Sequence, residues 1–428
     1  MSSKDPFANA TLCTHCGYCL PVCPTYRCDN DETHSPRGRV SIILAVRSGT
    51  LSPREATETL SRCLLCRACH VACPAGVKPA KLISHLRGQH PLPPLRLTRW
   101  LHRITNHHPR TRHAARLLRW YQASGLQTLL RRFRFLRFWP SLEQMEALLP
   151  AHRIDPIPAW PDPPSTPTRR VALLCGCMAR LFHPRTAPAT ANLLNLAGCE
   201  VVVPDGFGCC GAPYRENGDK PAFVTRARAT LAAFAKAAPV DAVICDSAIC
   251  AVTVQGYART LGSDPQLGQA ARELAAKVVD LATFLGPLLA SQGIAFGPPD
   301  QVRTIAYHDH CQTRFGSDII EQPRKWLEQL PVTQRELVTA GTQGSCCGAG
   351  GEYLLRHAHH SQTIRADKLA TIMASGAEVV AASNPGCILH LESGLRTNGA
   401  NVAVRHITEI FWNAYLNRPD QPNLKELP

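Results

Sequence analysis

From residue 169 onward, short apolar runs alternate with longer amphipathic stretches. Apolar runs of about four to eight residues between turn signals are typical of buried strands, whereas the longer stretches have helical spacing. Strands that alternate with helices predict parallel sheets, so we expect an α/β fold overall. The expected strands lie within 170–177, 200–204, 240–245, 303–311, 336–338 and 378–387, and helical patterns occupy 223–237 and 361–376.

This pattern is written twice, and cysteines mark the repeat. Cys210 precedes Cys250 by 40 positions, and Cys347 precedes Cys387 by the same 40 positions. Because open parallel sheets place ligand sites at the carboxyl ends of their strands, each copy is expected to gather four thiols around one crevice. The eight cysteines are Cys177, Cys209, Cys210 and Cys250 (the first cysteine set) and Cys311, Cys346, Cys347 and Cys387 (the second cysteine set).

The chain before the repeat divides into two parts. A helix is expected from Pro36, with Val40, Ile43 and Leu44 on its packed face. Residues 91–150 have the pattern of basic helices, and the proline-rich stretch 155–167 is typical of an extended linker. We therefore predict an N-terminal helical module at 1–90, a basic helical segment with its linker at 91–168, and two repeated α/β domains at 169–300 and 301–428.

The bulk composition is that of a folded protein, with 45% hydrophobic and 18% charged residues. The mean hydropathy is −0.12, and no apolar stretch approaches about eighteen residues, so no transmembrane helix is expected. The sequence opens MSSKDPFANATLC, without the basic and then apolar pattern of an export signal. We expect a cytoplasmic protein.

The formal net charge of +15 is concentrated in one segment. Between Pro91 and Leu142 there are eleven arginines and no Asp, Glu or Lys, and Trp, Tyr and Phe are interleaved with them. Arginine-rich helices with aromatic residues are typical of surfaces that dock on anionic membranes or on a partner subunit. A plain solvated basic face explains the same residues, and nucleic-acid binding is the weaker reading, so no nucleic acid is expected.

Eight cysteines within the first 73 residues repeat the spacing C-x2-C-x2-C-x3-C-P. This spacing is typical of bacterial ferredoxins with two [4Fe-4S] clusters, in which the fourth cysteine of each run ligates the other cluster. A zinc ribbon would bring two ligands from each knuckle rather than three, and disulfides need an oxidising compartment. The two runs are Cys13, Cys16, Cys19 and Cys23, and Cys63, Cys66, Cys69 and Cys73.

At this point the chain resembles the iron–sulfur subunits of glycolate oxidase, also called glycolate dehydrogenase. The matching stretches include CTHCGYCLPVCPTYRCDNDETHSPRGR, RCLLCRACHVACPAGV, FGCCGAP, SCCGAGGEY, AYHDHCQ and ASNPGC. The resemblance implies a bacterial-ferredoxin-like module followed by two cysteine-rich CCG domains. It also implies a first [4Fe-4S] cluster held by Cys13, Cys16, Cys19 and Cys73, and a second held by Cys63, Cys66, Cys69 and Cys23.

The same resemblance implies an electron-transfer role. Flavin-containing partner subunits would oxidise glycolate to glyoxylate, and this chain would pass the electrons towards a membrane quinone. A G-x-G-x-x-G match at Gly206–Gly211 is isolated, and the second copy loses its first glycines, so we expect FAD to reside only in the partner subunits. We expect no catalytic residue in this chain.

Alternatives remain at the two rear cysteine sets. Heterodisulfide reductases, which share these domains, end each motif with C-x2-C, whereas Cys387 stands alone and Cys245 lies five positions before Cys250. A further cluster, a zinc ion or thiols without metal all fit these sets, and buried cysteine can also pack as a small apolar residue. An iron–sulfur subunit of a lactate or glycerol-3-phosphate dehydrogenase and a disulfide reductase are the alternative functions.

Overall fold

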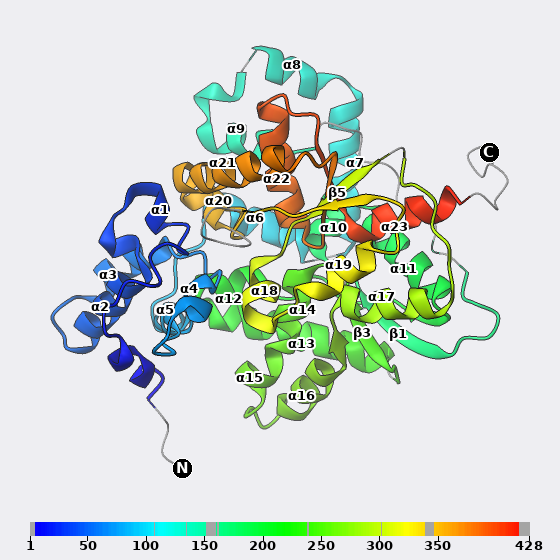
Figure 1. The fold of residues 1–428 in the computed structure, drawn as a ribbon. Helices are drawn as coiled ribbons and strands as arrows, with labels where there is room; N and C mark the ends of the chain where they lie inside the picture. Colours follow the sequence, from blue (N-terminus) through cyan, green and yellow to red (C-terminus); the bar gives the residue numbers. More distant parts are fainter. Residues whose placement is uncertain are drawn as a thin grey trace.

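The structure, a computed structural model, describes residues 5–106, 108–133, 135–150, 160, 162–237, 239–300, 302–338 and 346–418. An N-terminal helical module lies on one side of two sheet-containing domains, and a helical segment lies above them (Figure 1). The predicted α/β class is confirmed. Residues 155–159 and 161 of the predicted proline-rich linker lie outside the described residues.

The N-terminal module is helical, as predicted, with a core that includes Val40 and Ile43. Its central helix begins where the side chain of Ser35 accepts a hydrogen bond from the Gly38 amide, with proline in the first turn. A Cβ at Gly38 would lie 1.9 Å from the Glu32 carbonyl oxygen, so this crossing requires glycine. The elements are η1 (Ala8–Leu12), α1 (Tyr26–Asp29), η2 (Glu32–His34), α2 (Pro36–Arg47), α3 (Pro53–Ser61), α4 (Ala68–Ala72) and α5 (Pro79–Gln89).

The basic segment is helical, as predicted, and is fastened at both ends to the second α/β domain. Near its start, the buried carboxylate of Glu352 accepts hydrogen bonds from the Leu95 amide and the Thr98 hydroxyl, each at 2.6 Å. Near its end, the Ser393 hydroxyl donates to the Ala147 carbonyl oxygen at 2.8 Å. The elements are α6 (Arg96–Thr105), α7 (His108–Ala123), α8 (Leu126–Phe133), η3 (Phe135–Phe138) and α9 (Pro140–Leu148).

The first α/β domain is built on a parallel four-stranded sheet of order β2-β1-β3-β4. β3 is wholly buried and apolar, and so is β1 after its first two arginines, as expected for strands covered on both faces. The elements are β1 (Arg169–Leu174), α10 (Cys177–Phe182), α11 (Thr186–Leu196), β2 (Cys199–Val202), α12 (Ala212–Asn217), α13 (Lys220–Ala237), β3 (Ala242–Cys245), α14 (Ala248–Gln255), α15 (Tyr257–Leu261), α16 (Gly268–Lys277), β4 (Val278–Val279) and α17 (Leu281–Ser291).

The second α/β domain repeats this design with a parallel sheet of order β6-β5-β7-β8. The elements are β5 (Thr304–Tyr307), α18 (Cys311–Ser317), α19 (Glu321–Leu327), β6 (Thr333–Arg335), α20 (Tyr353–Arg356), α21 (Ala358–Ser375), β7 (Val379–Ala382), α22 (Pro385–Thr397), β8 (Ala403–His406) and α23 (Ile407–Leu416).

One strand prediction in this domain is wrong. Residues 336–338, with the sequence Glu-Leu-Val, were expected to form a strand, but the strand is β6, the polar segment just before them. β6 is an edge strand that pairs only with β5, and its side chains are largely solvent-exposed. Because an edge strand needs no second apolar face, hydrophobicity is a poor guide to its position.

One core runs through both α/β domains. Buried residues of β1 and β3 share a hydrophobic cluster with residues of β5, β7, α19 and α23. At its centre, the ring of Trp326 on α19 stacks on Phe411 of α23, with 4.5 Å between ring centroids. The two copies of the repeat therefore fold against each other, and their cysteines are held in a fixed relation.

Candidate metal centres

The N-terminal module gathers its cysteines around two small adjacent cavities. Cys13, Cys16, Cys19 and Cys73 line one of them, called the first cavity here. Cys23, Cys63, Cys66 and Cys69 line the other, the second cavity. Each cavity thus combines three cysteines of one run with the fourth cysteine of the other run, which is the arrangement of two-cluster ferredoxins. Cys69 lies on the lining of both cavities.

The backbone around the two cavities repeats as well. His15 and Leu65, each two residues after the first cysteine of its run, have φ of 58° and 53°, and Gly17 and Arg67 have φ of 88° and 70°. Left-handed residues interspersed in this way turn successive amide hydrogens towards one side and form concave sites for anions, including iron–sulfur clusters. The Leu65 amide already donates to the Cys63 sulfur at 3.4 Å. The residues present therefore fit a [4Fe-4S] group in each cavity.

Two arginines of the S-P-R-G-R segment lie one at each cavity. Arg37 lines the first cavity and donates to the His15 carbonyl oxygen at 2.8 Å, while its other contact is Glu32. Arg39 is buried at the second cavity, where its guanidinium lies 3.9 Å from the Cys23 sulfur and 3.0 Å from the Thr25 hydroxyl. A four-thiolate cluster carries negative charge, which these cations would balance. Neither role was predicted from the sequence, although the S-P-R-G-R segment between the two cysteine runs was the available signal.

The thiols of the first cysteine set form a chain of contacts at the carboxyl ends of β1 and β3. Cys177 contacts Cys209, Cys209 contacts Cys210, and Cys210 contacts Cys250. The contact with Cys210, together with burial, raises the pKa of Cys250 well above its ordinary value. Without metal, Cys250 is therefore protonated near neutral pH, and a metal ion would displace its proton.

The second cysteine set repeats this chain at the carboxyl ends of β5 and β7. Cys311 contacts Cys346, Cys346 contacts Cys347, and the Cys347 and Cys387 sulfurs are 3.0 Å apart. The glycine after each cysteine pair is required by the backbone, since Gly211 and Gly348 have φ of 89° and 83°. The predicted convergence of four cysteines in each copy is what the structure shows.

The four groups of cysteines are neighbours. Cys66, from the second cavity, packs in one apolar cluster with Cys311 and Cys346 of the second cysteine set. On the far side of that set, the Asn384 amide donates to the Cys387 sulfur at 3.3 Å and its oxygen lies 3.2 Å from the Ser247 hydroxyl, at the start of the helix that carries Cys250. The spacing of cysteines within each run or repeat did not predict which groups of cysteines lie next to one another.

The remaining cysteines have the surroundings expected of spare thiols. Cys175, Cys199 and Cys245 are buried among apolar residues of the first α/β domain, where they pack as small apolar side chains. Cys28 packs half-buried against the cluster that joins the N-terminal module to the second α/β domain.

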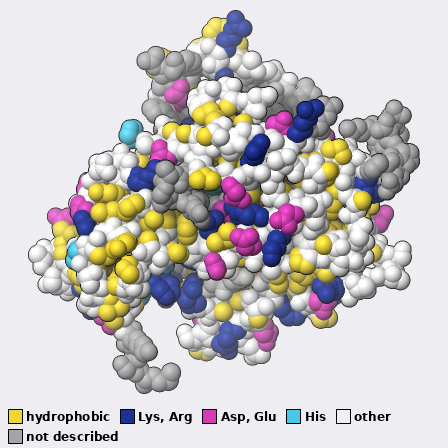
Figure 2. Space-filling model, in the orientation of Figure 1, with side chains coloured by type: hydrophobic (Ala, Val, Ile, Leu, Met, Phe, Trp, Pro, Cys, Tyr) yellow, Lys and Arg dark blue, Asp and Glu magenta, His cyan; other side chains and the backbone are white. Residues whose placement is uncertain are grey.

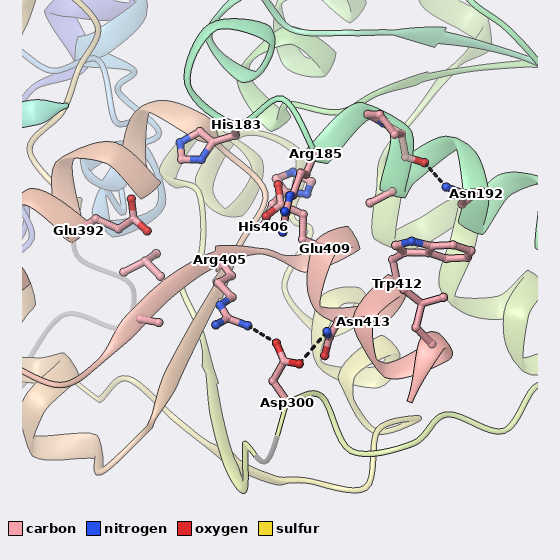
Figure 3. Close-up of a pocket in the computed structure, with 15 residues that line it drawn as sticks. His183, Arg185, Asn192, Asp300, Glu392, Arg405, His406, Glu409, Trp412 and Asn413 are labelled. Carbon is pink, nitrogen blue, oxygen red and sulfur yellow. Dashed lines mark hydrogen bonds and ion pairs between the residues drawn. The ribbon is translucent and has the colours of Figure 1, made fainter. Parts of the chain in front are cut away.

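A larger cavity of about 690 Å³ lies between α11, α22, β8 and α23, and no cysteine is among the described residues that line it. Figure 3 shows Glu392 on one side and Asp300 on the other, where Asp300 pairs with Arg405 at 3.1 Å and accepts from Asn413 at 2.9 Å. Burial, and then the neighbouring Glu409, raises the pKa of Glu392 to about 7. This cavity was not anticipated from the sequence.

The basic segment exposes an unusual number of large apolar side chains beside its arginines. Yellow and dark blue side chains meet at the top of the molecule, over the position of α8 (Figure 2). Among the described residues, Arg131 is paired, with Glu146 at 2.9 Å. The exposed members, called the linker surface here, are Trp100, Leu117, Trp120, Leu126, Leu129, Phe133, Phe135, Phe138, Trp139 and Leu142 with Arg96, Arg99, Arg103, Arg110, Arg112, Arg116 and Arg132.

Comparison with known proteins identifies the family. A model of the 4Fe-4S dicluster domain matches residues 9–77, a model of the linker region of the glycolate oxidase iron–sulfur subunit matches 94–149, and the cysteine-rich domain matches 171–255 and 305–392. The chain is 34% identical to the probable glycolate oxidase iron–sulfur subunit of Bacillus subtilis, over 94% of this chain and 93% of that protein. The chain belongs to the family of glycolate oxidase iron–sulfur subunits.

Other relatives agree with this assignment. The glycolate oxidase iron–sulfur subunit of Escherichia coli is 32% identical over 94% of this chain and 93% of its own length. The lactate utilization protein A of Shouchella clausii is 29% identical over 56% of this chain and 98% of that protein. A crystal structure of a hypothetical protein from Helicobacter pylori, with a TM-score of 0.52 and 13% identity over 91% of this chain and 69% of that one, shares the fold.

The family confirms several predictions. The chain is an iron–sulfur protein with a ferredoxin-type dicluster domain and two cysteine-rich domains, and it is related to electron-transfer subunits of an oxidoreductase. Among the described residues, we find no helix long and apolar enough to cross a membrane.

Proposed function

We propose that this chain carries electrons within a glycolate dehydrogenase, from flavin-containing subunits that oxidise glycolate to glyoxylate towards a quinone-type acceptor. The observation that carries the proposal is the pair of adjacent four-cysteine cavities in the N-terminal module. In this proposal Cys13, Cys16, Cys19 and Cys73 hold the first [4Fe-4S] cluster, and Cys23, Cys63, Cys66 and Cys69 hold the second. The clusters supply one-electron redox chemistry, and the protein supplies ligands, charge balance and exclusion of water.

The two cavities differ in exposure, which suggests a direction for the electrons. Cys16 of the first cavity is solvent-exposed, and the nearby Leu12, Tyr18 and Val71 expose large parts of their side chains. Figure 2 shows yellow patches on this side, where the N-terminal module lies. The second cavity is deeper, and its Cys66 packs beside Cys311. Electrons would therefore enter at the first cluster from a docked flavin subunit and pass inward to the second.

Stopped-flow mixing of the purified chain with its flavin subunits tests this function. Glycolate should bleach the cluster absorption only when the flavin subunits are present, and faster than lactate or glycerol 3-phosphate does. The Val71→Glu variant should slow this reduction by about tenfold or more, because a charge would be buried in the docking face. Val338→Glu is the matched control, since Val338 is 73% exposed on the second α/β domain and Val71 is 70% exposed.

Two results would count against the proposal. If glycolate left the clusters oxidised while lactate or glycerol 3-phosphate reduced them, the substrate would be one of the alternatives. If Val71→Glu and Val338→Glu slowed reduction equally, electrons would not enter at the first cavity.

The linker surface supports a second part of the proposal, contact with a membrane on the cytoplasmic side. No described carboxylate lies within ion-pair distance of its seven arginines, and aromatic side chains stand among them. An anionic headgroup layer would pair the guanidinium groups and accept the Trp and Phe rings at its boundary. Such peripheral contact would bring the subunit close to a quinone dissolved in the bilayer.

A further inference from the structure

The second cysteine set includes a histidine that the sequence repeat does not predict. His308 directly follows β5, and its side chain is fully buried. One ring nitrogen of His308 and the sulfurs of Cys347 and Cys387 all lie within 4.8 Å of one another. Neither ring nitrogen has a hydrogen-bond partner among the described residues. Burying an imidazole without a hydrogen-bond partner costs folding free energy, unless one of its nitrogens binds a ligand such as a metal ion.

The first cysteine set lacks this histidine. His308 lies three residues before Cys311, and the residue three before Cys177 is Leu174, which is fully buried. A second difference of the same kind is Lys368, which lies 21 residues after Cys347 and is buried on α21. The residue 21 after Cys210 is Leu231, also buried. Two apolar positions of the first copy are therefore an imidazole and an ammonium group in the second.

Both differences suit a bound metal ion. Both ring nitrogens of His308 are buried without a hydrogen-bond partner among the described residues, and an imidazole nitrogen is a common zinc ligand. The buried ammonium of Lys368 lies near the Asp309 carboxylate and the Cys347 and Cys346 sulfurs, so it would help to balance the charge of metal-bound thiolates. A buried imidazole and a buried ammonium group would destabilise the fold if the thiols beside them bound no metal.

We propose that His308 is a ligand in a mononuclear zinc site of the second cysteine set, with Cys347, Cys387 and one of Cys346 or Cys311. The compact donor set favours one ion over a cluster. Ligands of a tetrahedral zinc site, at about 2.0–2.3 Å from the metal, lie about 3.3–3.8 Å from one another. The first cysteine set has Leu174 in place of this histidine. Zinc has no redox chemistry, so this site would have a structural role beside the second cavity and would not accept an electron.

X-ray absorption at the zinc edge of the full-length, anaerobically purified chain tests the assignment, because iron in the ferredoxin-type module does not contribute at that edge. The wild-type chain supplied with Zn²⁺ should show sulfur neighbours at about 2.3 Å and a nitrogen at about 2.0–2.1 Å. His308→Cys should retain zinc with sulfur neighbours alone. His308→Leu, which copies the first set, should lower zinc affinity at least about tenfold in competition with a chelator.

The matched control is His310→Leu, which removes a buried histidine two residues away that is not within ligand distance of Cys347 and Cys387. This variant should keep the wild-type zinc affinity and nitrogen neighbour. The proposal is overturned if the wild-type chain holds less than about 0.1 zinc ion per chain or if its zinc has only sulfur neighbours. It is also overturned if His308→Leu and His310→Leu have the same zinc affinity. None of these results bears on the iron count of the N-terminal module, which tests the electron-transfer role separately.

Discussion

Replacing two arginines of the linker surface should weaken membrane binding by a measurable amount. Arg112 and Arg116 lie one turn apart on α7, both exposed, beside exposed Leu117 and Trp120. Each arginine near an anionic membrane surface contributes about 1 kcal/mol to binding. The Arg112→Gln/Arg116→Gln variant should therefore bind about 2 kcal/mol more weakly, which is about a 30-fold lower partition coefficient. The assay is flotation with vesicles that contain phosphatidylserine, at low salt.

The control for this variant removes the same charge elsewhere. Arg228 and Lys236 are exposed on α13, in the first α/β domain. The Arg228→Gln/Lys236→Gln variant should float like the wild type, and wild-type binding should fall steeply as the salt concentration approaches 1 M. Equal losses in the two variants, or no flotation of the wild type at low salt, would refute membrane docking through the linker surface and leave the partner subunit as its occupant.

Three further predictions concern the sites. Cys73→Ala should remove the first cluster and Cys23→Ala the second, so either change should lower the iron content from about eight to about four atoms per chain. Loss of the second cluster in Cys73→Ala, or of the first in Cys23→Ala, would contradict the crossed ligand sets. Gly348→Ala should destabilise the chain more than Gly399→Ala in urea unfolding. Both glycines have positive φ, but a Cβ at Gly348 would lie 2.6 Å from the Ser361 carbonyl oxygen, whereas a Cβ at Gly399 would meet open space. Equal urea midpoints would mean that the contact between the Cβ and the Ser361 oxygen is relieved. Glu392→Gln should stabilise the chain by up to about 3 kcal/mol at pH 8 and by much less at pH 5. The pKa of Glu392 in the folded state, about 7, exceeds its value in the unfolded chain, so the stability of the wild type falls as the pH rises between the two values. A difference in urea midpoint that does not depend on pH would show that Glu392 is not protonated on folding.

The repeat and its sheets could be predicted because their signals are local. β1 and β5 are short apolar runs, each followed by a cysteine, and the equal spacing from Cys210 to Cys250 and from Cys347 to Cys387 exposed the duplication. The edge strand β6 could not be placed in this way, since its residues are polar and pair on one side. The short strand β4 has only two residues, too few for a pattern.

The relation between the sites could not be predicted, because it depends on contacts between distant parts of the chain. Cys66 and Cys311 are far apart in sequence and meet only through the packing of the N-terminal module on the second α/β domain. Glu352 is similar, since its carboxylate is buried by Leu95 and Thr98 of a segment more than 250 positions away. His308 lies in a stretch quoted for its family resemblance, yet only its position beside Cys347 distinguishes it from an ordinary buried histidine.

We propose that the N-terminal module holds two [4Fe-4S] clusters that carry electrons. The iron content of the anaerobically purified chain, and its EPR spectrum after reduction by dithionite, test this proposal directly. We expect at least about eight iron atoms per chain and two reduced, interacting clusters. Fewer than about eight iron atoms in fully loaded protein, or a signal from only one cluster, would contradict it.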